Sequence, residues 1–207
     1  MWPLLICAIV SITVMIERFF ALRSVLAGSQ SLVREVRQAL ARGHERGARQ
    51  MLDIRGGPIA RLLLVAVKNR GLDRQDAESL ITEVAIEETP GLSRGLGALD
   101  TIVTVAPLLG LLGTVTGMIR AFQVVSISSG QTAPAAITGG VAEALIATAT
   151  GLAIAIVTLV GYNYLTSQVK SVVSQMEIGA TKIINVGLAV QSDDEPKREA
   201  TYASAGV

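Results

Sequence analysis

A single acidic residue, Glu143, lies deep in a long apolar stretch of this 207-residue chain. Between Asp100 and Glu177 the charged residues are Arg120, Glu143 and Lys170. An ionised carboxyl in the hydrocarbon of a membrane costs about 2.5–3.5 kcal/mol on insertion scales, so acids in such places usually carry a function. A carboxyl that alternates between its neutral and charged forms suits proton transfer. Glu143 is therefore a candidate proton-path residue.

A plainer interpretation of Glu143 stays open. The residue lies six positions into the span predicted below, near its outer end. There it could be solvated at the membrane surface, or it could pair with Arg120 near the outer end of the preceding span.

Threonines supply the other polar groups near Glu143. At about 100° per residue, Thr150 shares the helix face of Glu143, whereas Thr148 lies roughly 140° away. Thr114 lies in the preceding apolar stretch. A membrane threonine often bonds to its own backbone, so this pattern alone assigns no role to these residues.

Three glycines, Gly110, Gly113 and Gly117, recur at helical spacing in that preceding stretch. Small residues on one face let a second helix backbone approach closely in a membrane. This glycine face predicts helix packing, either within the chain or around the shared centre of an oligomer.

The elements that position these residues are predicted to be helices of an all-α membrane protein. Half of the residues are hydrophobic and only 3% are aromatic, a composition that fits small-residue packing in a membrane. Three segments are long and apolar enough to span, or nearly span, a bilayer. The predicted segments are a first span at 1–22, a cytoplasmic helical region at 23–98, a second span at 99–125, a short outer turn at 126–136, a third span at 137–165, and a cytoplasmic helix extension with a disordered tail at 166–207.

The basic residues predict the orientation of the spans. Segment 17–98 holds 13 of the 18 lysines and arginines, and the region after residue 165 holds four more. Because basic loops stay on the cytoplasmic side, the N-terminus is expected outside and the C-terminus in the cytoplasm. A cleaved signal peptide is the alternative for the first span, but its positive charge should come before the apolar run, and here it follows.

Helical patterns also run through the predicted cytoplasmic region. Between Arg23 and Gln50, apolar residues recur at helical spacing. Pro58 can begin a further helix, and Pro90 with Gly91 is expected to interrupt the helix before the second span. The tail from Ser192 lacks apolar anchors and is expected to be disordered.

Several classes of function are disfavoured. With only Cys7 and His44, the chain offers no cysteine metal cluster and few means for a zinc site or a hydrolase triad. An intramembrane enzyme is disfavoured because no Ser/His pair and no second membrane acid accompany Glu143. The mixed arginine and glutamate pattern suits a solvated helix face better than a nucleic-acid patch. No enzymatic activity, metal or cofactor is expected.

Four motifs carry a resemblance to a known family. They are Ala106–Gly110, Gly110–Gly117, Gly140–Ala149 and Ile16–Phe20. Together they resemble the MotA/TolQ/ExbB proton channel family, most closely its ExbB/TolQ branch, over nearly the whole chain. One departure is Val157, where relatives often have proline.

The resemblance implies an inner-membrane subunit of an ExbB–ExbD-like motor that uses the proton gradient to energise transport across the cell envelope. Such subunits form a homopentameric ring, in which the second and third spans enclose single helices of an ExbD- or TolR-like partner that bring an essential aspartate. A TonB-like protein is a further implied partner. By motif, Glu143, Thr114 and Thr148 match the proton-path residues, although the helical wheel favours Thr150 over Thr148.

Two alternatives remain beside this reading. A TolQ-like motor serving envelope integrity would have the same motifs. A structural scaffold that only holds partner helices would not need Glu143.

Overall fold

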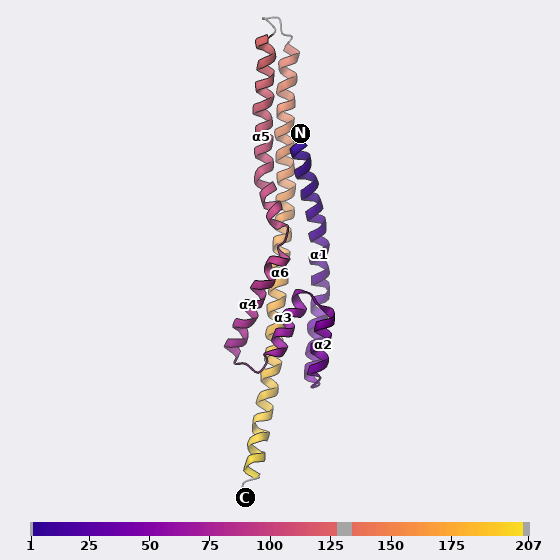
Figure 1. The fold of residues 1–207 in the computed structure, drawn as a ribbon, viewed down its shortest axis with the longest axis vertical. Coiled ribbons are helices and arrows are strands. Elements are labelled where there is room, and N and C mark those ends of the chain that lie inside the picture. Colours follow the sequence, from indigo (N-terminus) through magenta and orange to yellow (C-terminus); the bar gives the residue numbers. More distant parts are fainter. Residues whose placement is uncertain (1, 128–133, 205–207) are drawn as a thin grey trace. The chain divides into compact units, whose positions relative to one another are not determined.

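The computed structural model describes the backbone of residues 2–127 and 134–204 and the side chains of residues 2–123 and 138–185. All regular elements in these ranges are α-helices (Figure 1). In chain order they are α1 (Trp2–Ala41), α2 (Glu45–Arg55), α3 (Gly57–Lys68), α4 (Arg74–Leu92), α5 (Leu96–Ile127) and α6 (Pro134–Ser204). The predicted all-α class is confirmed.

Three of these helices are long and apolar enough to cross a membrane. Their qualifying segments are Trp2–Ala41, Leu96–Gln123 and Thr138–Asn185. Many of their large apolar side chains are exposed, as expected of helices whose surroundings are lipid or other helices. The three predicted membrane helices are therefore confirmed. Of the predicted outer turn, residues 128–133 lie outside the described residues.

The chain divides into two compact units. The first comprises residues 1–20 and 93–167, and the second comprises residues 21–92 and 168–207. Helices α1 and α6 contribute residues to both units.

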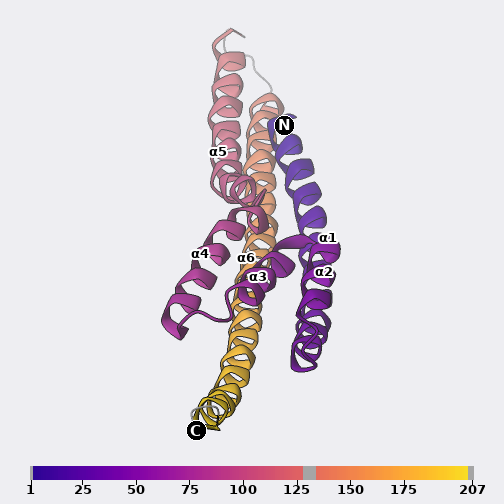
Figure 2. The ribbon, with the colours of Figure 1, turned by 60° about the horizontal axis from the view of Figure 1, so that its bottom comes forward.

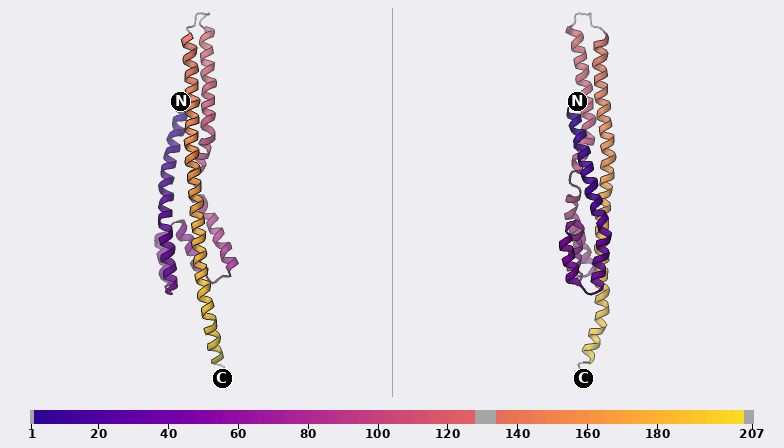
Figure 3. Two further views of the ribbon diagram at one scale, coloured as in Figure 1. Left: turned by 180° about the vertical axis from the view of Figure 1, so that it is seen from behind. Right: turned by 90° about the vertical axis from the view of Figure 1, so that its right-hand side faces the viewer.

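The first unit contains α5, the N-terminal half of α1 and the first part of α6. The ribbon of α5 runs beside that of α6 in every view (Figures 1 and 3). A small core joins all three helices, formed by Leu4, Ile102, Ala106 and Ala155 with Cys7, Leu109 and Ile154 packed against it. Because aromatic side chains are absent from this core, the helices meet through small and aliphatic residues.

The second unit packs the three short helices with the remainder of α1 and α6. Helix α3 contacts both α2 and α4, as Figure 2 also shows. Helix α3 buries most of its apolar residues. In the same unit, α1 buries Val36, and α6 buries Val172, Met176 and Ile183. Helices α1 and α2 are also joined by an ion pair between Glu35 and Arg55 at 3.8 Å.

Two helix boundaries predicted from the sequence were wrong. The helical pattern of segment 23–50 is broken at Gly43, whose φ of 76° lies in the left-handed region that favours glycine. Pro90 does not interrupt α4, which continues to Leu92, because a proline in the last turn removes only one backbone hydrogen bond. The chain turns instead at Gly95, where φ is 80°.

The backbone of helix α6 runs through Ser192 to Ser204. The side chains from residue 186 onward lie outside the described residues, and the disorder expected of this tail stays a prediction. Residues 205–207 lie outside the described residues.

Candidate functional site

The contact between α5 and α6 is made through glycine and alanine. A Cβ placed on Gly113 would lie 2.7 Å from the Cβ of Ala147, and one on Gly117 would lie 2.8 Å from the Cβ of Ala144. Real Cβ atoms essentially never come this close, so no larger residue fits without moving the helices. Here the predicted glycine face packs against α6 of the same chain.

The same contact extends along both helices. A Cβ on Gly110 would lie 3.0 Å from the Cα of Thr148, and one on Gly151 would lie 2.6 Å from the carbonyl oxygen of Ala106. Toward the C-terminal end of α5, a Cβ on Gly140 would lie 2.9 Å from the Cβ of Ala121. These pairs fix an antiparallel register between the two helices.

The α6 side of this contact was not predicted from the sequence. The contacting residues of α6 are Gly140, Ala144, Ala147 and Gly151, spaced 4-3-4 along the helix. This spacing keeps side chains on one helix face, so it could have been recognised beside the glycines of α5.

Glu143 lies on the flank of this helix pair. Ala144 is buried against Gly117, and Glu143 is one residue, or about 100°, away from it around α6. In the chain by itself the Glu143 side chain is exposed, within an apolar segment long enough to cross a membrane. A carboxyl on such a surface would be costly against lipid, so it calls for water, another helix or another copy of the chain.

A pairing of Glu143 with Arg120 finds no support in the geometry. The register of the helix pair puts the two residues within about one turn of each other along the axis. Both side chains are nevertheless exposed, and no ion pair joins these two described residues.

Thr148 connects the two helices. Its hydroxyl donates a hydrogen bond of 2.9 Å to the carbonyl oxygen of Gly110. The side chain therefore points toward α5, away from the flank that carries Glu143. No sequence signal distinguished this bond from the backbone bonds that most membrane threonines make within their own helix.

The other two threonines bond within their own helices. Thr150 donates to the carbonyl oxygen of Ile146 at 2.8 Å, and Thr114 donates to that of Leu111 at 2.7 Å. Because α6 is unbroken here, the helical wheel holds: Thr150 lies on the Glu143 side of α6, and Thr148 does not. The described residues offer no cluster of histidine, cysteine and acidic groups that could hold a metal ion.

This geometry describes an apolar helix hairpin that carries one exposed carboxyl. By itself it could bind a cation or relay a proton only if other groups covered Glu143. Its parts, in chain order, are the glycine face of α5 and the acid-bearing flank of α6.

Comparison with known proteins places this hairpin in a family. Residues 55–178 match the model of the MotA/TolQ/ExbB proton channel family. A biopolymer transport protein ExbB homolog of Methanothermobacter thermautotrophicus is 31% identical over 176 residues, which are 84% of this chain and 62% of that protein. An ExbB-like protein of Synechocystis is 34% identical, over 81% of this chain and 66% of that protein. The biopolymer transport protein exbB1 of Vibrio cholerae is 28% identical, over 85% of this chain and 78% of that protein.

The chain thus spans just under two thirds of the length of the first two relatives. The match to the family model covers more than half of the chain, including all of α5 and the part of α6 that carries Glu143. This chain belongs to the MotA/TolQ/ExbB proton channel family.

Proposed function

We propose that this chain is the channel subunit of an inner-membrane motor, in which protons moving down their gradient pass Glu143 and energise biopolymer transport across the cell envelope. One observation carries the proposal: an exposed carboxyl on an apolar, membrane-length helix, beside a close-packed glycine hairpin. The exposure of Glu143 on such a helix supports the proposal, because it leaves the acid available to groups outside this chain.

One acid on one helix does not make a proton path. The ring and partner proposed here supply what is missing: a homopentamer repeats Glu143 about an axis, and an ExbD- or TolR-like single-span helix brings a second carboxylate. A TonB-like protein is the proposed recipient of the work. The role is binding and conduction, without enzymatic chemistry.

The proposed orientation follows from charge. The second unit carries most of the arginines, with Arg34, Arg37, Arg55 and Arg61 among them. Basic segments remain on the cytoplasmic side, so this unit and the C-terminus lie in the cytoplasm and the N-terminus outside.

The test replaces the acid and keeps its shape. In everted membrane vesicles with an acidified lumen, from cells that make the chain with its single-span partner, Glu143→Gln should abolish gradient-driven proton efflux, measured with a pH-sensitive dye. Glu143→Asp, which keeps a carboxyl on a shorter side chain, should retain a fraction of the flow. Asp53→Asn is the matched control, because it neutralises an exposed carboxylate on α2 that the described residues leave without an ion pair.

The scaffold alternative makes the opposite prediction. A subunit that only holds partner helices would support full energised transport with glutamine at position 143. Such a result, with normal assembly, would overturn the channel proposal.

A further inference from the structure

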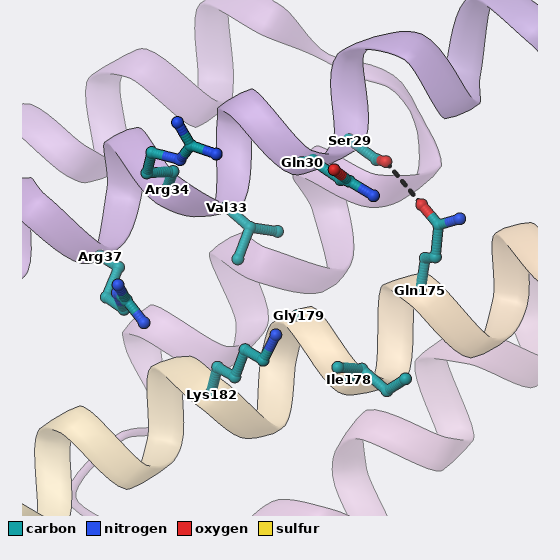
Figure 4. A pocket seen from close by; sticks show the side chains of 9 residues that line it. All are labelled: Ser29, Gln30, Val33, Arg34, Arg37, Gln175, Ile178, Gly179 and Lys182. Carbon is teal, nitrogen blue, oxygen red and sulfur yellow. Dashed lines mark hydrogen bonds between the residues drawn. The ribbon is translucent and has the colours of Figure 1, made fainter.

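A basic groove lies between α1 and α6 in the second unit (Figure 4). It encloses about 470 Å³. Arg34 and Arg37 of α1 line one wall and Lys182 of α6 the other. At one end a hydrogen bond of 2.8 Å joins the Ser29 hydroxyl to the amide oxygen of Gln175. The lining of this groove has three cationic side chains and no carboxylate.

The three cations are exposed and uncompensated in the part of the chain that the structure describes. No ion pair there involves Arg34, Arg37 or Lys182. The neighbouring Glu35 pairs with Arg55 of α2 instead. A groove of like charges therefore lacks an anionic partner within these residues.

The two helices that form the groove are in close contact. Gly179 of α6 lies so close to α1 that a Cβ there would be 2.8 Å from a methyl carbon of Val33. The Ser29–Gln175 bond also joins the two helices.

The groove lies in the second unit, which the proposed orientation assigns to the cytoplasm because of its basic residues. The occupant that we consider is therefore an acidic protein surface.

An acidic surface lies on α4 of the same chain. This helix buries Ala77, Ile81 and Ala85 and turns its opposite side outward. That outer side, the acidic face, comprises Gln75, Glu78, Ser79, Thr82, Glu83, Ile86 and Glu87. Ile86, which is 66% exposed, lies among these carboxylates and adds an apolar contact to the face.

Two carboxylates of this face are available for pairing. Glu78 is engaged by Arg74 at 2.9 Å, but no ion pair involves Glu83 or Glu87 among the described residues. Glu83 and Glu87 are four positions apart on α4, and Arg34 and Arg37 are three positions apart on α1. The Cβ atoms within each pair are therefore about 5–6 Å apart, so the two carboxylates have the same spacing as the two arginines.

We propose that the acidic face of α4 in one copy of this chain docks into the basic groove between α1 and α6 of the next copy. The two surfaces share no residue and lie on different helices, so their contact is head-to-tail, and such a contact forms a ring when the rotation between copies closes. The inference rests on the oligomeric ring of the proposed function and identifies the cytoplasmic surfaces that hold it together.

The test reverses charges and then exchanges them. In the full-length protein, Arg34→Glu with Arg37→Glu should remove most of the oligomer, as should Glu83→Lys with Glu87→Lys. Combining all four substitutions restores opposite charges and should return the oligomer to near its original abundance. Native mass spectrometry in mild detergent gives the measurement. Asp53→Lys, a charge reversal on exposed α2 outside both surfaces, should leave the oligomer unchanged.

Cross-linking provides an independent readout. In a Cys7→Ser background, membranes containing one chain with Arg34→Cys and a second with Glu83→Cys should form a disulfide-linked dimer, and each variant made alone should not. The proposal is overturned if the reversed variants assemble normally, if the fourfold variant is not restored, or if the mixed cross-link is absent. Any of these outcomes with proton flow still dependent on Glu143 would reject the docking surface and leave the channel function standing.

Discussion

At the residue scale, the exposure of Glu143 is informative because its surroundings are apolar. A lone carboxyl on a membrane helix is tolerated when water or another polar group reaches it. The structure turns Glu143 away from the helix contact and turns the Thr148 hydroxyl into it. The two polar residues that the family motif groups together therefore have different surroundings in a single chain.

The Thr148 hydroxyl bonds to α5, whereas the Thr150 hydroxyl bonds within α6, so removing the two hydroxyls should have different effects. Thr148→Val deletes a hydrogen bond between helices and leaves the Gly110 carbonyl with one partner fewer, which should lower the free energy of unfolding by about 0.5–1.5 kcal/mol. Thr150→Val deletes a bond within one helix and should change it by less than about 0.5 kcal/mol. Titration of the detergent-solubilised protein with dodecyl sulfate measures both. Equal effects would show that the bond to Gly110 does not stabilise the hairpin.

The position of Glu143 could be predicted from the sequence, but its partners could not. The absence of other charges between Arg120 and Lys170 singles the residue out. Which groups cover it depends on other chains, and no pattern within this chain encodes their geometry. The bond of Thr148 was also beyond prediction, because it depends on the register between α5 and α6, which spacing along one helix does not define.

At the element scale, the glycines of α5 act as a matched surface for α6. The sequence predicted their packing role but left open whether the partner was in the same chain. Glycine spacing reports only which face is small, so it is the register, visible in the pairs Gly113–Ala147 and Gly117–Ala144, that answers the question for one chain. Because this glycine face of α5 is already covered by α6, a contact between two copies of the chain requires another surface.

Because α5 and α6 are so close at the glycines, a methyl group added there should lower the free energy of unfolding. Gly113→Ala places a methyl group 2.7 Å from that of Ala147, so the helices must separate, at a cost of about 1–3 kcal/mol in unfolding free energy. Gly97→Ala is the control on the same helix, because nothing lies within 4 Å of its new methyl group and alanine favours the helix. The same dodecyl sulfate titration should show loss at position 113 and none at position 97. A loss at both positions would instead indicate a general sensitivity of α5.

At the scale of the whole molecule, the sequence predicted three spans and a helical cytoplasmic part because apolar length and charge asymmetry are strong signals. Helix boundaries were harder. Pro90 was expected to end α4, yet the turn occurs at Gly95, because one lost hydrogen bond in a final turn matters less than access to positive φ. Local composition predicts that a chain turns, while packing decides where it turns.

The charge asymmetry predicts which side of the membrane each part occupies, and labelling can test it. In a Cys7→Ser background, Asp53→Cys lies in the basic region, and Ser126→Cys lies in the predicted outer turn, which has no lysine or arginine. A membrane-impermeant maleimide should label Ser126→Cys in intact spheroplasts and should label Asp53→Cys only after the membrane is permeabilised, because basic segments stay in the cytoplasm. Cys7→Ser without an added cysteine controls for background. Labelling of Asp53→Cys in intact spheroplasts would invert the topology, and with it the direction in which protons pass Glu143.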